Sequence, residues 1–301
     1  MTRIVHIINP VKVSETSDLF FAQPITFESL RKAKDFSTKK EQITLVTTSF
    51  EEDLEIIPTD FQKLSNLTRS VLDVNTNLKG KKLPLIADIL GKTNELNNCD
   101  YILYTNMDIA VMPQFYDALF EYINQGHDAV IINRRRIETT YKTVDKLPFM
   151  YSDLGKSHPG FDCFLFKREL LDKLILDDIC VGIPFLEVSL IHNLFSFAEK
   201  PLFVPDAHLT FHLGMDVMPP INKNFYWHNR TTFFNKINPK LKDKYALSKF
   251  PYAELSLPNR ALKWMLNPGI FTRTYIKLEG KNFWRKLKLR LNEIRWRMLQ
   301  K

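Results

Sequence analysis

Glycine is scarce in this sequence of 301 residues, where nine glycines stand against 16 prolines and 23 phenylalanines. So little glycine excludes a flexible, linker-rich chain and a collagen-like one. No segment repeats with a period of about 20 to 50 residues, which excludes a solenoid or a propeller. Because 45% of the residues are hydrophobic, we expect a full core, in one large α/β domain with appendages or in two modest domains.

Cysteine and long apolar runs are also rare. The three cysteines, Cys99, Cys163 and Cys180, have no CxxC spacing and lie in apolar stretches, so we expect free thiols in a reducing compartment. The N-terminal run, Met1–Ile8, is too short for the apolar core of a signal peptide, and no run of about 18 uncharged apolar residues occurs. The sequence therefore predicts a cytoplasmic protein without a membrane-spanning helix.

The formal net charge of +8 is confined to one end of the chain. Residues 273–301 contain ten Lys or Arg residues and two Glu residues, so this segment alone accounts for the whole excess. The remaining chain is neutral as a whole and lacks the extended basic surface of a nucleic-acid enzyme. We therefore expect no nucleic-acid partner.

Apolar, β-branched runs alternate with segments of helical periodicity, a pattern that predicts a mostly parallel sheet covered by helices. The expected strands are Ile4–Ile8, Ile43–Thr48, Ser70–Val74, Tyr101–Thr105, Ala129–Asn133, Cys163–Phe166, Leu202–Val204 and Leu209–His212. The expected helices are Thr26–Phe36, Pro84–Asn97, Pro113–Asn124, Arg168–Leu176 and Pro184–Phe197. Ligands of such sheets bind beyond the carboxyl ends of the strands, so functional residues are expected there.

The strand Tyr101–Thr105 is followed by Asn106-Met107-Asp108. A carboxylate at the end of a buried strand needs a cation, an arginine or a helix N-terminus as its partner, and the alternative is a helix cap. The preceding segment, Gly80–Leu90, places Lys82 at the start of an expected helix. Lys82 and the N-terminal amides of that helix could hold an anion near a metal ion.

These residues resemble the GT-A glycosyltransferases of the bacterial polysaccharide type, in which such a strand ends in a D-x-D motif that binds a divalent metal and the diphosphate of a sugar nucleotide. The resemblance covers residues 1 to about 215, with Asn106-Met107-Asp108 as the motif in N-x-D form. A neutral Asn is a weaker ligand of cations than Asp, so Asp108 is the principal carboxylate. The resemblance further implies that Asn9-Pro10 receives the nucleotide base and that Lys82 faces the diphosphate.

Two acids are candidates for a catalytic base. Asp162 stands at the mouth of the apolar strand Cys163–Phe166, in a segment that resembles the acceptor-pocket segment of the family, and it could accept the proton of an acceptor hydroxyl. Its alternative is a turn-forming Asp. Glu187 lies in the first turn of the helix Pro184–Phe197, where the family often has an acidic pair that includes the base. Its alternative is complementation of the helix dipole.

A late histidine completes the metal shell in many GT-A enzymes, and His212, just before Gly214, resembles it. Imidazole suits Mn²⁺, whereas Mg²⁺ prefers oxygen ligands, so we expect Mn²⁺ before Mg²⁺. The alternative is a structural histidine. The run Arg134-Arg135-Arg136 follows a strand and either contacts an anionic donor or acceptor or forms a solvated loop.

The last segment, residues 281–301, is predicted to form a basic amphipathic helix. Its apolar residues recur at the spacing of one helical stripe: Phe283, Leu287, Leu291, Ile294 and Met298. Basic residues and two tryptophans flank this stripe, as in helices that lie on an anionic membrane. A helix docked on the body of the protein or on a dimer partner is the alternative.

The sequence thus predicts an α/β protein with a GT-A fold, a Rossmann-like mixed sheet flanked by helices. The catalytic domain, residues 1–215, comprises a nucleotide-sugar-binding half, 1–108, and an acceptor half, 109–215, and is followed by an extension, 216–301. The expected reaction is metal-dependent transfer of a sugar from a nucleoside-diphosphate sugar to a hydroxyl of a glycan or a lipid-linked acceptor.

Two alternatives to this reaction remain open. A sugar-phosphate nucleotidylyltransferase of related fold would need a glycine-rich loop after the first strand, where Asn9-Pro10-Val11-Lys12 contains no glycine. A non-catalytic, membrane-apposed scaffold would keep the fold without turnover. The N-x-D form of the motif gives this second alternative some support.

Overall fold

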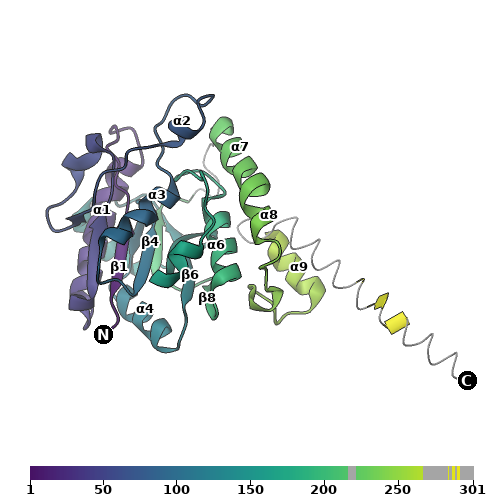
Figure 1. Ribbon diagram of the computed structural model, residues 1–301. Coiled ribbons are helices and arrows are strands. Elements are labelled where there is room, and N and C mark those ends of the chain that lie inside the picture. Colours follow the sequence, from purple (N-terminus) through teal and green to yellow (C-terminus); the bar gives the residue numbers. More distant parts are fainter. Residues whose placement is uncertain (216–221, 267–283, 285–286, 289, 292–301) are drawn as a thin grey trace, which may run out of the picture.

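A computed structural model describes residues 1–215, 222–266, 284, 287–288 and 290–291. Nine strands of this part form one sheet with helices on both faces (Figure 1). The strands are β1 Ile4–Ile8, β2 Ile43–Thr47, β3 Gln62–Lys63, β4 Tyr101–Thr105, β5 Ile109–Val111, β6 Ala129–Ile137, β7 Lys156–Lys167, β8 Pro201–Val204 and β9 Thr210–Leu213.

The α-helices of the same part are α1 Leu19–Phe36, α2 Val71–Val74, α3 Ile86–Gly91, α4 Phe115–Asn124, α5 Leu147–Ser152, α6 Leu186–Phe197, α7 Lys223–Thr232, α8 Asn238–Leu241 and α9 Leu257–Leu266. Short 3₁₀ segments cover Lys40–Gln42, Glu51–Ile56, Lys92–Glu95, Val144–Lys146, Arg168–Lys173 and Leu247–Lys249. A π-helical turn, Phe233–Ile237, joins α7 to α8.

The sheet is mixed, with strand order β3-β2-β1-β4-β7-β6-β9-β5. The strands from β3 to β4 are parallel, whereas β7 runs antiparallel to both β4 and β6. The long strand β6 pairs with β8 along its first half and with β9 along its second half. Strand β9 also pairs with β5. This corner of the sheet therefore places Ile109–Val111, which follow β4 in the chain, next to β9.

Alternation of apolar side chains along the strands supplies both faces of the sheet with a core. On one face, Ile102 and Tyr104 of β4 pack with residues of α3 and α6. On the other face, Leu103 packs with residues of α1 and α4. Two-sided burial of this kind explains why the central strands are almost continuously apolar.

The predicted mixed sheet with flanking helices is confirmed, and the strands Ile4–Ile8 and Tyr101–Thr105 have the predicted bounds. The strand predicted over Ser70–Val74 is wrong, because these residues form helix α2. The Oγ atom of Ser70 accepts from the N–H of Leu72, and the carboxylate of Asp73 accepts from the N–H of Ser70. This capping box starts a helix in a sequence that otherwise favours a strand.

The α-helix predicted over Arg168–Leu176 is also wrong. Residues Arg168–Lys173 form a 3₁₀ turn, and the chain then becomes extended at Leu174. The side-chain amide of Asn193 on α6 binds the backbone of Ile175, accepting from its N–H at 2.6 Å and donating to its carbonyl at 2.9 Å. These bonds to α6 replace the bonds that a longer helix would make.

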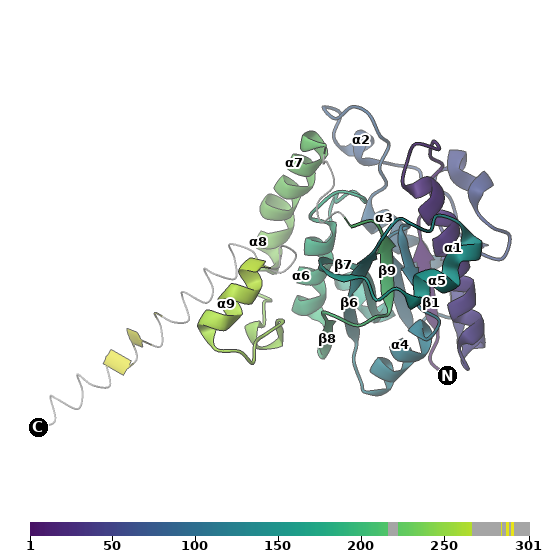
Figure 2. The same ribbon diagram turned by 180° about the vertical axis from the view of Figure 1, so that it is seen from behind.

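Residues 222–266 pack on α6, at the end of the molecule opposite to α1 (Figures 1 and 2). Phe233, Ile237, Phe250 and Trp264 belong to the same buried cluster as α6. The division of the chain at residue 215 and its two halves stay a prediction. In the described part, every helix is too short or too polar to cross a membrane.

The basic helix predicted over 281–301 lies outside the described residues, apart from positions 284, 287–288 and 290–291. The three cysteines Cys99, Cys163 and Cys180 are free thiols, as predicted.

Candidate active site

Three adjacent strands bring three polar side chains to one edge of the sheet. The last residue of β4, Thr105, pairs with Cys163 of β7, and Cys163 pairs in turn with Ile132 of β6. Asn106 directly follows Thr105, Asp162 directly precedes Cys163, and Arg134 lies two residues after Ile132. These three residues therefore lie side by side although they come from distant parts of the sequence. This is the carboxyl edge of the parallel strands, where ligands of such sheets bind.

Hydrogen bonds join these side chains into one row. Asn106 Nδ2 donates to Asp162 Oδ1 at 2.7 Å, and Arg134 Nη1 donates to Asp162 Oδ2 at 2.8 Å. The hydroxyl of Tyr104 donates to Asn106 Oδ1 at 2.9 Å. Only 11% of the Asp162 side chain and 13% of the Arg134 side chain are exposed, so both oxygens of this carboxylate are engaged inside the protein.

Asp108 and His212 form a second pair at the same edge. Strand β5 starts directly after Asp108, and its first residue, Ile109, is the register partner of His212 on β9. The Nε2 atom of His212 lies 3.1 Å from Asp108 Oδ2. Burial acts to raise the pKa of Asp108, but the hydrogen bond and charge of His212 and the charge of Arg134 outweigh it, so the pKa is lowered. Asp108 is therefore held as a carboxylate.

The donor set of this pair fits a divalent cation. Carboxylate and imidazole together suit Mn²⁺, and hard cations are commonly held by one or two carboxylates plus the phosphates of a substrate. The Nδ1 atom of His212 is buried and has no hydrogen-bond partner within the described residues. In the same part of the chain, no three His, Cys, Asp or Glu side chains form a complete set of ligands. Asp108 and His212 would hold the ion jointly with a bound diphosphate.

Glu187 lies in the first turn of α6, and an unusual backbone conformation precedes it. Phe185, at the N-cap, has φ 79° and ψ −4°, in the left-handed region that favours glycine. The ring of Phe185 packs against those of Tyr226, Phe233 and Phe234, each with its centroid 5.7 Å away. Aromatic packing thus holds a strained residue in place directly before Glu187.

The carboxyl group of Glu187 is strongly perturbed. Burial raises its pKa to about 7, with a further rise from the negative charge of Asp162 and an opposing effect of Arg134. Glu187 therefore senses the charges of the Asp162–Arg134 pair. A carboxyl group with a pKa near 7 exchanges protons readily at neutral pH, as a general base must.

Lys82 lies beside the residues that follow β2, two strands away from Asp108. Its Nζ atom is 2.8 Å from a carboxylate oxygen of Glu52 and 3.9 Å from the ring centroid of Phe50. The side chain is 45% exposed. The predicted contact of Lys82 with a diphosphate thus requires that Lys82 exchange Glu52 for a phosphate.

Asn9-Pro10 lies where the carboxyl ends of β1 and β2 meet. Asn9 Nδ2 donates to the carbonyl of Thr48 at 2.6 Å, and the hydroxyl of Ser49 donates to the carbonyl of Pro10 at 2.7 Å. These two bonds fix the first two loops to each other. Asn9 and Pro10, predicted to receive the nucleotide base, thus lie at the carboxyl edge of the sheet. The side-chain amide of Asn9 and the carbonyl of Pro10 are hydrogen-bonded to the loop after β2.

The arginine run is neither a solvated loop nor a free anion site. Arg135 Nη1 lies 2.6 Å from the carboxylate of Asp206, and Arg136 Nη2 donates to the carbonyl of Ser157 at 3.2 Å. Arg134 is bound to Asp162, as described above. The three guanidinium groups therefore tie the end of β6 to its neighbours.

Two contributors to this site, Tyr104 and Phe185, were not singled out from the sequence. The alternation of side chains along β4 places Tyr104 on the same face as Asn106, so this alternation could have identified Tyr104 from the sequence. The left-handed conformation of Phe185 has no local signal, because glycine is the residue that such a position favours.

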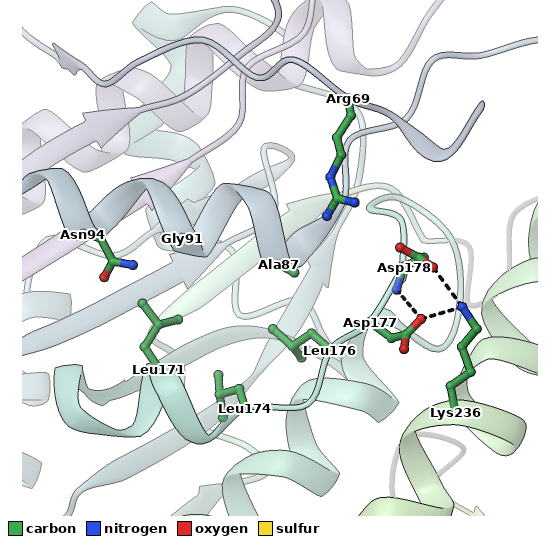
Figure 3. Close-up of a pocket in the computed structure, with 10 residues that line it drawn as sticks. All are labelled: Arg69, Ala87, Gly91, Asn94, Leu171, Leu174, Leu176, Asp177, Asp178 and Lys236. Atoms are coloured by element: carbon green, nitrogen blue, oxygen red, sulfur yellow. Dashed lines mark hydrogen bonds and ion pairs between the residues drawn. The ribbon is translucent and has the colours of Figure 1, made fainter. Parts of the chain in front are cut away.

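A separate cavity of about 500 Å³ lies between α3, the segment 171–178 and the π-helical turn (Figure 3). Lys236 crosses its rim and binds Asp177 and Asp178 at 2.8 and 2.9 Å. Arg69, also at the rim, forms a two-bond pair with Asp88. Each of these charged groups thus has an oppositely charged partner, and the cavity is lined by none of the predicted site residues.

No family model matches the chain, and no similar sequence is found among the curated proteins. Several solved structures are similar to it over most of its length. TarS from S. aureus in complex with UDP-GlcNAc is 9% identical, with 91% of this chain and 83% of that chain covered and a TM-score of 0.45. Glucosyl-3-phosphoglycerate synthase from Mycobacterium tuberculosis, in complex with Mn²⁺, UDP-glucose and phosphoglyceric acid, is 12% identical, with 77% and 79% covered and a TM-score of 0.45.

A third similar structure is the mannosyltransferase PcManGT from Pyrobaculum calidifontis in complex with GDP-Man and Mn²⁺. It is 14% identical, with 95% of this chain and 80% of that chain covered and a TM-score of 0.44. At such identities and TM-scores the similarity assigns no activity to this chain. The predicted Rossmann-like mixed sheet flanked by helices is confirmed by the topology of this chain itself, with parallel strands β3-β2-β1-β4 followed by the antiparallel β7, as expected for the predicted GT-A fold class.

Proposed function

We propose that this chain transfers a sugar from a nucleoside-diphosphate donor to a hydroxyl of a glycan or a lipid-linked acceptor, with a divalent cation. The observation that carries the proposal is the Asp108–His212 pair at the carboxyl edge of the sheet, where a lowered pKa keeps Asp108 ionised. A bound cation would neutralise the charge that develops on the departing diphosphate. Mn²⁺ is the expected ion, with Mg²⁺ as the alternative.

Glu187 is the better supported of the two candidate bases. Both carboxylate oxygens of Asp162 accept hydrogen bonds from Asn106 and Arg134, which leaves little capacity to take up a proton. The pKa of Glu187 is raised to about 7 by burial. In an inverting reaction, Glu187 would accept the proton of the acceptor hydroxyl as that oxygen attacks the anomeric carbon.

The donor is proposed to lie along the edge from Asn9-Pro10 to Asp108. The carboxyl ends of β1, β2 and β4 meet there in parallel register, and the exposed cation Lys82 lies at one side. The basic segment 281–301 is proposed to contact an anionic membrane, because its net positive charge adjoins an apolar stripe in the sequence.

Hydrolysis of sugar nucleotides without an acceptor tests the proposal. UDP-glucose, UDP-GlcNAc and GDP-mannose are each incubated with the full chain, with Mn²⁺ or with a chelator, and release of the nucleoside diphosphate is measured. We expect Mn²⁺-dependent release from at least one donor, and none from Asp108→Asn. Release that is equal in both proteins, or absent with every donor, would contradict the proposal and favour the scaffold.

A further inference from the structure

Asn106 is the residue at which this chain departs from the D-x-D pattern, and every polar group of its side chain is used inside the protein. Its Nδ2 atom donates to Asp162 Oδ1 at 2.7 Å, and its Oδ1 atom accepts from the hydroxyl of Tyr104 at 2.9 Å. The backbone N–H of Asn106 also donates to the carbonyl of Asp162, at 3.4 Å. Asn106 and Asp162 are thus joined by both side chain and main chain.

The chemistry of this contact requires an amide at position 106. An Asp at that position would place one carboxylate oxygen against another at the present distance of 2.7 Å. Two carboxylates that share a site cannot both be ionised without a large penalty. An Asn has almost the same shape as an Asp but offers an N–H donor, so it accommodates the acid opposite.

Arg134 completes the arrangement on the other side of Asp162. It donates to Asp162 Oδ2 at 2.8 Å, and both of these side chains are largely buried. Buried charges of this kind persist only when they are paired and hydrogen-bonded. The amide of Asn106 therefore helps to satisfy an ion pair that spans β7 and β6 next to Asp108.

We propose that Asn106 and Asp162 are a matched pair, in which the carboxylate expected at position 106 is carried by Asp162 on the neighbouring strand. Asn106 is then a positioning residue, which orients Asp162 and, through it, Arg134, and it does not bind the cation. The assignment of the cation to Asp108 and His212 rests on the proposed function. The pairing itself rests only on the hydrogen bonds described here.

A double-mutant cycle tests the pairing. The variants are Asn106→Asp, Asp162→Asn and the exchange that combines both, with thermal unfolding measured at pH 7. Asn106→Asp should melt lower because two carboxylates then face each other, and Asp162→Asn should melt lower because Arg134 loses its charged partner. The exchange should melt above both single variants, since its amide at 162 can donate to the carboxylate at 106 and accept from Arg134. Losses that simply add in the exchange would overturn the pairing.

Asn106→Ala keeps the test decisive if Asn106→Asp does not fold. The alanine variant removes the donor without adding a charge, so it should melt lower than the unmodified chain but above Asn106→Asp. An Asn106→Asp variant that melts at least as high as Asn106→Ala would also overturn the pairing.

Mn²⁺ binding supplies a readout that a purely structural role of the pair would not change. Free Mn²⁺ is measured by electron paramagnetic resonance in the presence of each folded variant, with Asp108→Asn as the control. The exchange places a carboxylate two residues before Asp108, so it should bind Mn²⁺ several-fold more tightly than the unmodified chain. Equal affinity would overturn the claim that the charge at 106 has moved to 162. Loss of Mn²⁺ binding from every variant, including the unmodified chain, would instead contradict the proposed function, while the melting temperatures still decide the pairing.

Discussion

His212 lies with its Nε2 atom 3.1 Å from Asp108 Oδ2 because β9 pairs with β5 in a register that sets His212 opposite Ile109. The contact therefore depends on one short antiparallel ladder at the corner of the sheet. Strand β6 supports the ladder from the other side, since Arg136 is the register partner of His212. The proposed cation-binding pair thus comes from two segments that only the sheet brings together.

Replacement of Asp108 should abolish Mn²⁺-dependent release of nucleoside diphosphate while the fold is kept. Asp108→Asn preserves the shape and removes the charge, so it should be nearly as inactive as Asp108→Ala. His212→Asn should be less damaging, because a neutral amide oxygen can still act as a weak ligand. Asp206→Asn, in an exposed acid that pairs with Arg135, is the control and should remain active. A folded Asp108→Asn variant with normal turnover would rule out the cation site.

The rate should depend on pH through Glu187. The base must be ionised to accept a proton, so turnover should rise as the pH increases through about 7, the raised pKa of Glu187. Glu187→Gln should lower turnover by about 10²- to 10⁴-fold, the usual effect of losing a general base, and should flatten this rise. Turnover in Glu187→Gln within tenfold of the unmodified chain would contradict the role of Glu187.

Stability should depend on pH through the same group, with a fixed sign. The pKa of Glu187 is raised from 4.5 to about 7 in the folded state, so the folded chain holds this proton more tightly. The resulting stability is fully present below about pH 4.5 and is lost as the pH rises to about 7. The free energy of unfolding in urea is measured for Glu187→Gln and for the unmodified chain at pH 5 and at pH 8. Because glutamine does not ionise, the stability of Glu187→Gln relative to the unmodified chain should be greater at pH 8 than at pH 5. A constant difference between the two proteins would show that the pKa of Glu187 is not raised in the folded chain.

Position 185 should prefer glycine to alanine, the reverse of the usual order. Phe185→Gly and Phe185→Ala both lose the ring contacts with Tyr226, Phe233 and Phe234. The alanine variant keeps a side chain at φ 79°, which costs about 1 kcal/mol or more, whereas glycine accepts this conformation freely. Urea unfolding should therefore find Phe185→Gly more stable by about 1 kcal/mol. An alanine variant of greater stability would mean that the backbone at 185 is not strained.

Deletion of residues 281–301 should release the chain from vesicles that contain phosphatidylserine and spare the hydrolysis of sugar nucleotides. Each basic residue near an anionic surface contributes on the order of 1 kcal/mol, and salt screens this term, so binding should also weaken as the ionic strength rises. Leu287→Glu combined with Leu291→Glu places charge on the apolar stripe and should release the chain even at low salt. Misfolding of the truncated chain, or loss of an oligomer, would indicate a packing role for this segment.

Local patterns in the sequence were sufficient where a single segment decides its own structure. The strands Ile4–Ile8 and Tyr101–Thr105 were predicted with the observed bounds, because short, mostly apolar runs rich in β-branched or aromatic residues and bounded by polar residues favour buried strands. The strand predicted at Ser70–Val74 failed for an equally local reason. A capping box between Ser70 and Asp73 outweighs the preference of its apolar residues for a strand.

The sequence by itself determined the α/β class, the sheet edge on which Asp108 lies and the polar residues that follow each strand. The resemblance to a known family already implied that Asp108 and His212 come together, and the structure places them in contact. The tertiary structure alone decided that Asn106 meets Asp162 and that Lys82 meets Glu52. The physical reason is that secondary structure follows from apolar periodicity within one segment. A contact between distant segments depends on strand register and side-chain direction, and a shift of one residue in register reverses which side chains face each other.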